Sequence, residues 1–596
     1  GGITVGASSN LSGGINNISN ITGLGRPAVI EGITVEESSD ISGGINNRSN
    51  ITGFRGESST AIKVLSGSDI SGGINNSGSI AGSSGNGISV YNSSDISGGI
   101  NNSGSIASAG SSGNGISVLS SSDISGGIIN SGSIIADSNA IEVMGGSNIN
   151  GILNQESGII NSKLGGESAG ESGNAGIYVN SGSSITGGIV NHGVIDAIDE
   201  GIHISNGSEV IGGITNSGYI YGSTAIKIAG SVDLITNEVG GLIRGLTAIS
   251  GSSRTDNIVN AGTIEGEVYL GDGDDFFTLQ TGSMIDGDVD AGSGRDSLII
   301  AGDITEDSEF TNFEGLRVIS GNATLSIDTL DFNTLDVEGG SLNYAASATA
   351  ATVDAGAMLS GTGTFGSLMM GGTVSPGNST GTMTVTGDYT MGTEAIYEAE
   401  IMGDGTSDLI QVGGVATLDG TLNLTMLDDP DQYNSETPYT VLTEANGVSD
   451  EFSNITWDVV NIDGLTYPTQ EIVGDDLNII FESTVDLFEG DAKKANQTGV
   501  AAGLAITAAK STTGQALFGA SASDRRSAME EAGGNSLATW SGVMAADANE
   551  YLNTVASEVS VVAKDTVAGW GKFYSLSGTA ASSSNARGYS HRNSGM

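Results

Sequence analysis

Aspartates in two glycine-rich segments are the residues of this sequence with the clearest potential chemistry. The pattern Gly-x-Gly-x-Asp-x-apolar occurs at 271–277 and again at 292–298, and it gathers Asp272, Asp274, Asp275 and Asp296. Carboxylate and carbonyl oxygens are the ligands that Ca²⁺ prefers, and glycine frees the backbone to bring carbonyls into the coordination shell. We therefore take these four aspartates as candidate calcium ligands; the alternative is two acidic turns of successive structural repeats.

The same segments resemble the calcium-binding nonapeptides of RTX repeats, a likeness that would imply a calcium-dependent secreted protein. Leu270 and Ala291 stand where that family has its leading glycine, and Arg295 places a positive charge beside the second segment. We therefore expect no tight calcium site here. No other cofactor is expected.

Residues for nucleophilic or acid–base catalysis are sparse. The acidic groups considered for catalysis are Asp199-Glu200 and those in the segments above, and the histidines are His192, His203 and His591. There is no credible Ser/His/Asp set, so we expect no enzyme. The alternative is a polysaccharide-degrading enzyme, because parallel β-helices also carry such enzymes.

These residues lie in or just after a long repeat. A phrase of Ile, any residue, Asn, a small residue and Gly recurs at intervals of about 25 residues, which is typical of a solenoid. The recurring asparagines are Asn17, Asn47, Asn76, Asn102, Asn130, Asn154, Asn191, Asn216, Asn237 and Asn260.

Short β-branched segments within each repeat predict strands rather than helices, because they alternate apolar with small polar residues between glycines. We expect three brief strands per turn, stacked into an all-β, right-handed parallel β-helix. The inward residues of one repeat should stack on those of the next, so that no repeat folds alone. For two successive repeats these are Ile70, Ile74, Ile80, Ile88 and Val90, and Ile96, Ile100, Ile106, Ile116 and Val118.

The recurring asparagine is expected at a tight turn with left-handed backbone angles. Stacked in successive repeats, these amides should hydrogen bond one another as a structural ladder. A row of ligand-binding amides is the alternative. The clearest ladder candidates are Asn76, Asn102, Asn130, Asn154, Asn191 and Asn216.

Charge and composition restrict the partners. The chain has 596 residues, no Cys and a formal net charge of −50. Such a charge excludes nucleic-acid binding driven by phosphate contacts and disfavours anionic membrane surfaces. The sequence opens within a repeat and shows no basic, apolar leader, so we expect that any signal peptide has been removed or was not included.

The composition predicts several regions along the chain. The Asn/Gly-rich repeats should cover 1–264, with an insertion near 165–176, and a β-helix with the acidic turns should cover 265–352. A stem of longer strands is expected over 353–485, at Thr382–Thr386, Ala395–Ile401, Leu409–Val412, Thr421–Met426, Tyr439–Leu442 and Leu477–Phe481. A short α-helical linker should follow at 486–565, with helical text at Ala495–Lys510 and Ser523–Lys564.

The stem resembles the C-terminal end of an autotransporter passenger domain of the pertactin type. The Ser375–Ser379 turn, and Asp408 followed by apolar residues and Gly413, carry the resemblance most clearly. In that family the helical linker threads a translocator barrel. Trp570–Tyr574 resembles the first strand of such a barrel, so we expect 566–596 to be the start of a truncated barrel.

This resemblance implies a secreted or surface-displayed structural and adhesive stalk on a Gram-negative cell, exported through the outer membrane. The implied partners are host or bacterial cell-surface molecules or further copies of the chain, together with the outer-membrane translocation machinery.

Overall fold

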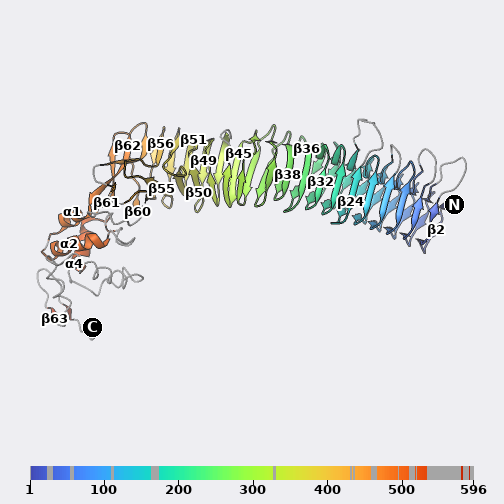
Figure 1. Ribbon diagram of the computed structural model, residues 1–596, viewed down its shortest axis with the longest axis horizontal. Helices are drawn as coiled ribbons and strands as arrows, with labels where there is room; N and C mark the ends of the chain where they lie inside the picture. Colours follow the sequence, from blue (N-terminus) through green and yellow to red (C-terminus); the bar gives the residue numbers. More distant parts are fainter. Residues whose placement is uncertain are drawn as a thin grey trace. The chain divides into compact units, whose positions relative to one another are not determined.

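The computed structural model consists of two compact units, residues 1–342 and 343–596 (Figure 1). It describes residues 2–22, 31–53, 59–108, 113–162, 174–325, 331–429, 432–433, 437–457, 466–493, 495–508, 517, 520–532, 579–580 and 589–590. The division at 342/343 does not coincide with the domain boundaries expected from composition, at 264/265 and 352/353. Those boundaries remain predictions.

The first unit is a right-handed parallel β-helix, as predicted. One complete turn, here called a rung, consists of β10 (Asp69–Ile70), β11 (Ile74–Asn76), β12 (Ser79–Gly82) and β13 (Ile88–Tyr91). A rung thus has four strands and not the three expected, because the segment after the recurring asparagine forms two strands separated by a turn. The next rung repeats the pattern as β14 (Asp95–Ile96), β15 (Ile100–Asn102), β16 (Ser105–Ser108) and β17 (Ile116–Leu119).

These strands form three groups of stacked strands in the first unit. The first sheet contains, besides β10 and β14, β2 (Asn10–Leu11), β6 (Asp40–Ile41), β18 (Asp123–Ile124), β22 (Asn148–Ile149), β26 (Ser184–Ile185), β30 (Glu209–Val210) and β34 (Ser231–Val232). The second contains, besides β11 and β15, β3 (Ile15–Asn17), β7 (Ile45–Asn47), β19 (Ile128–Asn130), β23 (Ile152–Asn154), β27 (Ile189–Asn191), β31 (Ile214–Asn216), β35 (Ile235–Asn237), β37 (Asn257–Asn260), β39 (Phe276–Gln280), β42 (Ser297–Ala301), β45 (Gly315–Ser320) and β47 (Phe332–Val337).

The third sheet holds the two remaining strands of each rung. Besides β12, β13, β16 and β17 it contains β1 (Ile3–Val5), β4 (Ile21–Thr22), β5 (Ile33–Val35), β8 (Asn50–Thr52), β9 (Ile62–Leu65), β20 (Ser133–Ala136), β21 (Ile141–Met144), β24 (Ile159–Ser162), β25 (Ala175–Val179), β28 (Val194–Ala197), β29 (Glu200–Ile204), β32 (Tyr219–Tyr221), β33 (Thr224–Ile228), β36 (Leu242–Ser250), β38 (Thr263–Tyr269), β40 (Met284–Asp286), β41 (Val289–Asp290) and β44 (Phe310–Thr311). In addition, β43 (Ile304–Glu306) pairs in parallel with β46 (Asn322–Leu325), and β48 spans Ser341–Asn343.

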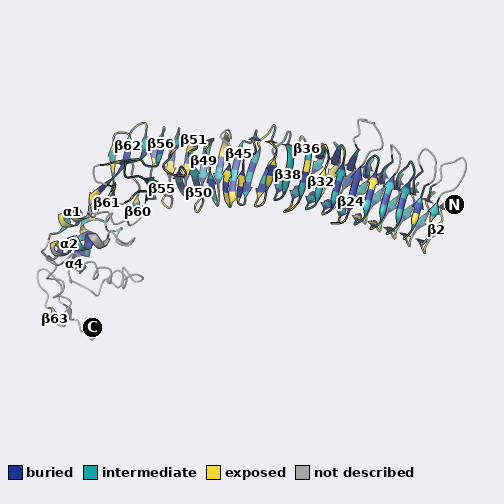
Figure 2. Ribbon diagram, in the orientation of Figure 1, coloured by how far each residue is buried: buried dark blue, intermediate teal, exposed yellow. Residues whose placement is uncertain are grey.

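Identical residues stack between rungs in this unit. Ile70 pairs with Ile96 and Ile74 with Ile100, and the same holds for the Ile80, Ile88 and Val90 positions. All ten of these side chains are fully buried. The predicted inward set is therefore confirmed, and Figure 2 shows buried positions alternating with more exposed ones along the strands.

The prediction that the recurring asparagine adopts left-handed backbone angles is wrong. Asn76 and Asn102 are the last residues of β11 and β15, and neither has a positive φ. The left-handed position falls on the glycine before each of these strands, with φ of 74° at Gly73 and 75° at Gly99. Glycine adopts these angles without a Cβ penalty, so asparagine is free to remain in the strand.

The second unit continues with parallel strands that are mostly longer. They are β49 (Ser347–Val353), β50 (Met358–Gly361), β51 (Thr364–Met370), β52 (Thr373–Pro376), β53 (Thr382–Val385), β54 (Tyr389–Met391), β55 (Ile396–Ile401), β56 (Leu409–Val412), β57 (Ala416–Thr417), β58 (Thr421–Met426), β59 (Tyr439–Glu444) and β60 (Asn454–Trp457). The stem strands expected from sequence are present, with ends shifted by a few residues. Aromatic side chains fill this core, and Tyr439 meets Phe481 edge to face at 5.7 Å between ring centroids.

An antiparallel hairpin follows these parallel strands. β61 (Thr466–Val473) pairs with β62 (Asp476–Ser483), and β62 also pairs antiparallel with β59. This hairpin occupies the hydrogen-bonding edge of β59 that a further parallel strand would use. Parallel stacking in this sheet therefore stops there.

Helices α1 (Thr484–Asp491), α2 (Ala495–Ala508) and α4 (Ala522–Ala532) come next. They match the start of the expected linker, whereas 533–565 and the barrel-like Trp570–Tyr574 lie outside the described residues. A short pair, β63 (Thr579–Ala580) and β64 (Tyr589–Ser590), is antiparallel. Within the described part, no helix is both long enough and apolar enough to cross a membrane.

Successive rungs pack closely at the glycine that lies two residues after the recurring asparagine. A Cβ added at Gly104 would overlap the carbonyl oxygen of Gly78 in the rung before, whereas a Cβ at Gly13 would meet nothing. We predict that Gly104→Ala lowers the free energy of unfolding by about 2 kcal/mol through overpacking, measured by denaturant titration. The control Gly13→Ala should be neutral or slightly stabilising, and equal effects of the two substitutions would contradict the packing.

Candidate functional site

An unbroken ladder of buried amides runs through the first unit. The Nδ2 of Asn17 donates to the Oδ1 of Asn47, and the same bond joins each recurring asparagine to the next as far as Asn260, at 2.6 to 2.9 Å. No member is more than 4% exposed. All six ladder candidates lie in this series, which we call the inner ladder.

Each inner amide is held by further bonds to the backbone. The Nδ2 of Asn76 also donates to the carbonyl oxygen of Ser105, at 3.0 Å, in the following rung. Asn102 does the same with Ser133 at 3.0 Å. At the far end, Asn260 donates to the Oγ of Ser283 at 2.7 Å. These bonds satisfy amides that burial would otherwise leave unpaired at considerable cost.

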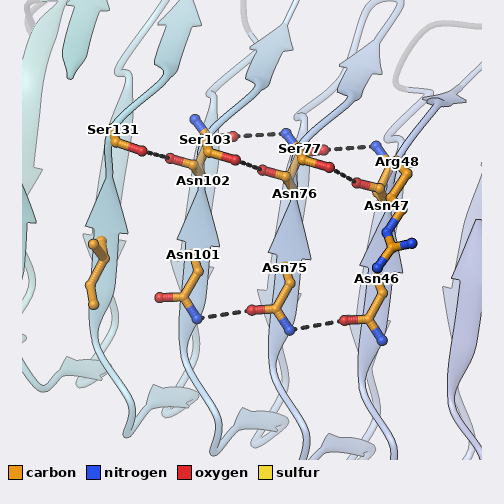
Figure 3. Close-up of a pocket in the computed structure, with 11 residues that line it drawn as sticks. Asn46, Asn47, Arg48, Asn75, Asn76, Ser77, Asn101, Asn102, Ser103 and Ser131 are labelled. Carbon is orange, nitrogen blue, oxygen red and sulfur yellow. Dashed lines mark hydrogen bonds between the residues drawn. The ribbon is translucent and has the colours of Figure 1, made fainter. Parts of the chain in front are cut away.

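A second amide ladder lies on the outside of the same strands, and sequence analysis missed it. Asn46 donates to Asn16 at 3.0 Å. Asn75 donates to Asn46 and Asn101 to Asn75, each also at 3.0 Å (Figure 3). These four residues form the outer ladder. The available signal was the Ile-Asn-Asn order: successive strand residues alternate faces, so when the second Asn points inward the first must point outward.

An open groove, called the amide groove, runs along the outer ladder. It is lined by Asn46, Asn75 and Asn101, by the inner-ladder residues Asn47, Asn76 and Asn102, by Ser77, Ser103 and Ser131, and by Arg48 and Ile129. Figure 3 shows the outer amides in one row and the serines in a second row. The serine hydroxyls donate to inner-ladder carbonyls, as Ser103 does to Asn76 at 3.2 Å. The lining therefore contains no carboxylate, although the chain is strongly acidic.

The four candidate calcium ligands face different surroundings. Asp275 and Asp296 are buried, whereas Asp272 and Asp274 are exposed. Asp274 accepts a hydrogen bond from the backbone N–H of Arg295 at 3.0 Å. Among the described residues, no group of three or more His, Cys, Asp or Glu side chains could hold a metal ion.

The two buried aspartates belong to a column in which carboxyl groups bind the backbone of neighbouring rungs. The N–H of Asp256 donates to Asp275 at 2.7 Å, and the N–H of Asp275 donates to Asp296 at 2.8 Å. The N–H of Asp296 in turn donates to Glu314 at 2.7 Å. We call these four residues the carboxyl column.

Burial raises the pKa values of the three aspartates in this column. Burial and the neighbouring carboxylates raise the pKa of Asp275 to about 7, and they also raise the pKa of Asp296, whereas burial alone raises the pKa of Asp256. The second oxygens of Asp275 and Asp296 are buried without a hydrogen-bond partner. A proton on these groups removes the penalty of a buried, partly unpaired charge.

The histidines considered for catalysis lie in separate settings. His192 contacts the Oγ of Ser217 at 2.6 Å. His203 packs against Tyr178, and burial lowers the pKa of its imidazole. Its Nδ1 lies 3.9 Å from Glu200, whose carboxylate pairs with Lys227 at 3.0 Å. His591 lies outside the described residues.

Asp199, and Asp408 of the stem motif, each accept hydrogen bonds from backbone N–H groups. Asp199 accepts the N–H of Asn174 at 3.0 Å. In the second unit, Asp408 is fully buried and accepts the backbone N–H groups of Gly381, at 2.7 Å, and Glu400, at 2.8 Å. Burial raises the pKa of Asp408 to about 7.

The inner ladder should stabilise the first unit cooperatively. We predict that Asn102→Ala and Asn130→Ala each lower the free energy of unfolding by about 1 to 2 kcal/mol, because each leaves buried partners unpaired. The double variant should be non-additive, since the two residues share a hydrogen bond. Denaturant titration measures all three variants, and the exposed Asn101→Ala is the control. Additive effects near zero would remove the ladder from the stabilising interactions.

The carboxyl column should make the protein more stable at mildly acidic pH. The folded pKa of Asp275, about 7, lies above the ordinary value of 3.8, so the unfolded chain loses its proton first. The stabilisation is complete below pH ~4 and is lost as pH rises to about 7. Asp275→Asn should flatten this part of the stability–pH profile, while the exposed Asp274→Asn should not. An unchanged profile for Asp275→Asn would contradict the assignment.

No family model and no curated protein matches this chain.

Proposed function

We propose that the chain is a structural and adhesive stalk, displayed at or secreted from the surface of a Gram-negative cell as an autotransporter passenger domain. The observation that carries the proposal is the stacking of equivalent residues from rung to rung, with an inner amide ladder that runs from Asn17 to Asn260. Such an arrangement gives a long, repetitive surface without disulfides. This suits a chain that crosses a membrane unfolded and has no Cys.

The residues that carry the family resemblance occupy structural positions that support the same proposal. At the Ser375–Ser379 turn, Gly377 has φ of 82° and donates its N–H to the carbonyl of Gly361 at 2.7 Å. Asp408 joins the backbone of two further segments, as described above. Both features fit a stem whose role is to fold firmly.

The proposed partners follow from this role. They are host or bacterial cell-surface molecules or a second copy of the chain, and the outer-membrane machinery during export. The net charge of −50 gives no basis for nucleic-acid binding. A polysaccharide-degrading enzyme is a weaker alternative. Glu200, His203 and Lys227 meet, but the carboxylate of Glu200 is paired with Lys227, and the adjacent Asp199 accepts the backbone N–H of Asn174. A glycan-degradation assay on the purified chain separates the two.

Export as a passenger makes a prediction about the order of folding. If the C-terminal end emerges first, the stem must fold before the Asn-rich rungs, and a stacked array grows from an existing end. Leu422 and Ile100 are both fully buried, so Leu422→Asp and Ile100→Asp are matched disruptions of the two regions. On cells that express the full-length gene product, Leu422→Asp should reduce antibody labelling of intact cells more than Ile100→Asp does.

Limited proteolysis in denaturant provides the complementary measurement. Residues 353–485 should survive as the last resistant fragment after the N-terminal rungs have melted. Survival of the N-terminal rungs instead would contradict this folding order. Absence of labelling on intact cells expressing the unaltered protein would contradict surface display itself.

A further inference from the structure

We infer that the amide groove is a binding site for a linear, uncharged polysaccharide. The inference deepens the proposed adhesive function and rests on it for its biological setting. A primary amide has two N–H donors and two acceptor lone pairs, and the bonds to neighbouring rungs use one donor and one lone pair of Asn46 and of Asn75. The ladder thus leaves one donor and one lone pair of each amide for a ligand.

These groups are held in place before any ligand arrives. Lateral bonds at 3.0 Å fix the outer amides, and hydroxyl-to-carbonyl bonds at 3.2 Å fix Ser77 and Ser103 on the other side of the groove. The serine hydroxyls use their protons in these bonds, so their oxygens remain available as acceptors. Pre-organisation of this kind lowers the entropy lost on binding.

The spacing of the groove favours a polymer over a small molecule. Successive rungs lie about 4.8 Å apart, as neighbouring strands of a sheet do. Two successive rungs repeat the same pair of an amide and a hydroxyl, Asn75 with Ser77 and Asn101 with Ser103, and the rung before them carries Asn46 with Arg48. An extended β-linked sugar chain advances by a similar distance per unit. Each sugar can then present its hydroxyls to one rung, since a hydroxyl both donates and accepts.

The charge of the groove selects an uncharged chain. Its lining contains no carboxylate, and its single cation is Arg48. The chain around it carries a net charge of −50, which repels acidic polysaccharides over the rest of the surface. A neutral sugar chain meets neither repulsion nor the cost of burying an unpaired charge.

The sequence itself marks one end of the site and supplies the test. In the rung after Asn101 the equivalent residue is Ile129, and Leu153 and Val190 follow in the same column. The fold therefore accepts apolar side chains at this position, so Asn75→Ile with Asn101→Ile should remove the amides without unfolding the protein. Thr215→Ile with Thr236→Ile introduces the same side chain in the same column, outside the groove.

The experiment is isothermal titration of the purified full chain with soluble oligomers, of increasing length, of β-1,4-linked glucose, mannose and N-acetylglucosamine. At least one series should bind, with affinity rising with length. The Asn75→Ile/Asn101→Ile variant should lose about tenfold or more in affinity, equivalent to about 1.4 kcal/mol. The Thr215→Ile/Thr236→Ile control should bind normally, and Ile129→Asn, which extends the amide row, should bind more tightly.

Several outcomes would overturn the inference. The inference fails if none of the neutral series binds, or if the Asn75→Ile/Asn101→Ile variant binds as tightly as the unaltered protein. It also fails if only the acidic oligomer oligogalacturonate binds and Arg48→Gln abolishes that binding. Concentration-dependent self-association that the Asn75→Ile/Asn101→Ile variant prevents would assign the groove to a second copy of the chain instead. Because the titration uses purified protein, glycan binding without labelling of intact cells would leave the inference standing and remove the display proposal. Labelling of intact cells without glycan binding would leave the display proposal standing and remove the inference.

Discussion

The hydrogen bond between buried asparagine amides of neighbouring rungs is the constraint on which the first unit depends. An amide inside an apolar stack is tolerated only when its partner in the next rung is the same group at the same height. The register of the strand pairs that carry this ladder is thereby fixed, since a slip by one residue would place Asn75 rather than Asn76 against Asn102. The neighbouring glycines follow from the same constraint, because rungs close enough for amide contact leave no space for a Cβ at Gly104.

The two amide ladders run in opposite directions. Inner amides donate toward the following rung, as Asn76 does to Asn102, whereas outer amides donate toward the preceding one, as Asn101 does to Asn75. Their dipoles therefore oppose each other along the stack. Carboxyl groups are stacked by a different means: the Oδ1 of Asp95 accepts a backbone N–H from Asp123, at 2.9 Å, so that like charges on successive rungs are bridged by the main chain.

Much of the fold could be predicted from sequence, because the repeat places identical residues at identical positions and the apolar alternation shows which face inward. The left-handed position was misplaced because asparagine beside glycine is also the usual composition of a turn, and only the alternation along Ile74-Asn75-Asn76 separates the two. The candidate site was harder to predict from sequence than the fold. The spacing of the acidic turns located Asp275 and Asp296, but their burial follows from their position directly before β39 and β42, two residues before the buried Phe277 and Leu298.

The identity of successive interfaces has a consequence for how such a chain changes over time. Asp69, Ile70, Ile74 and Asn76 pair with the same residue types at 95, 96, 100 and 102. A deletion or duplication of one whole rung in the gene would therefore join surfaces that already fit. Unequal recombination between the repeated stretches can therefore change the length of the β-helix by one rung at a time, while each intermediate length remains foldable.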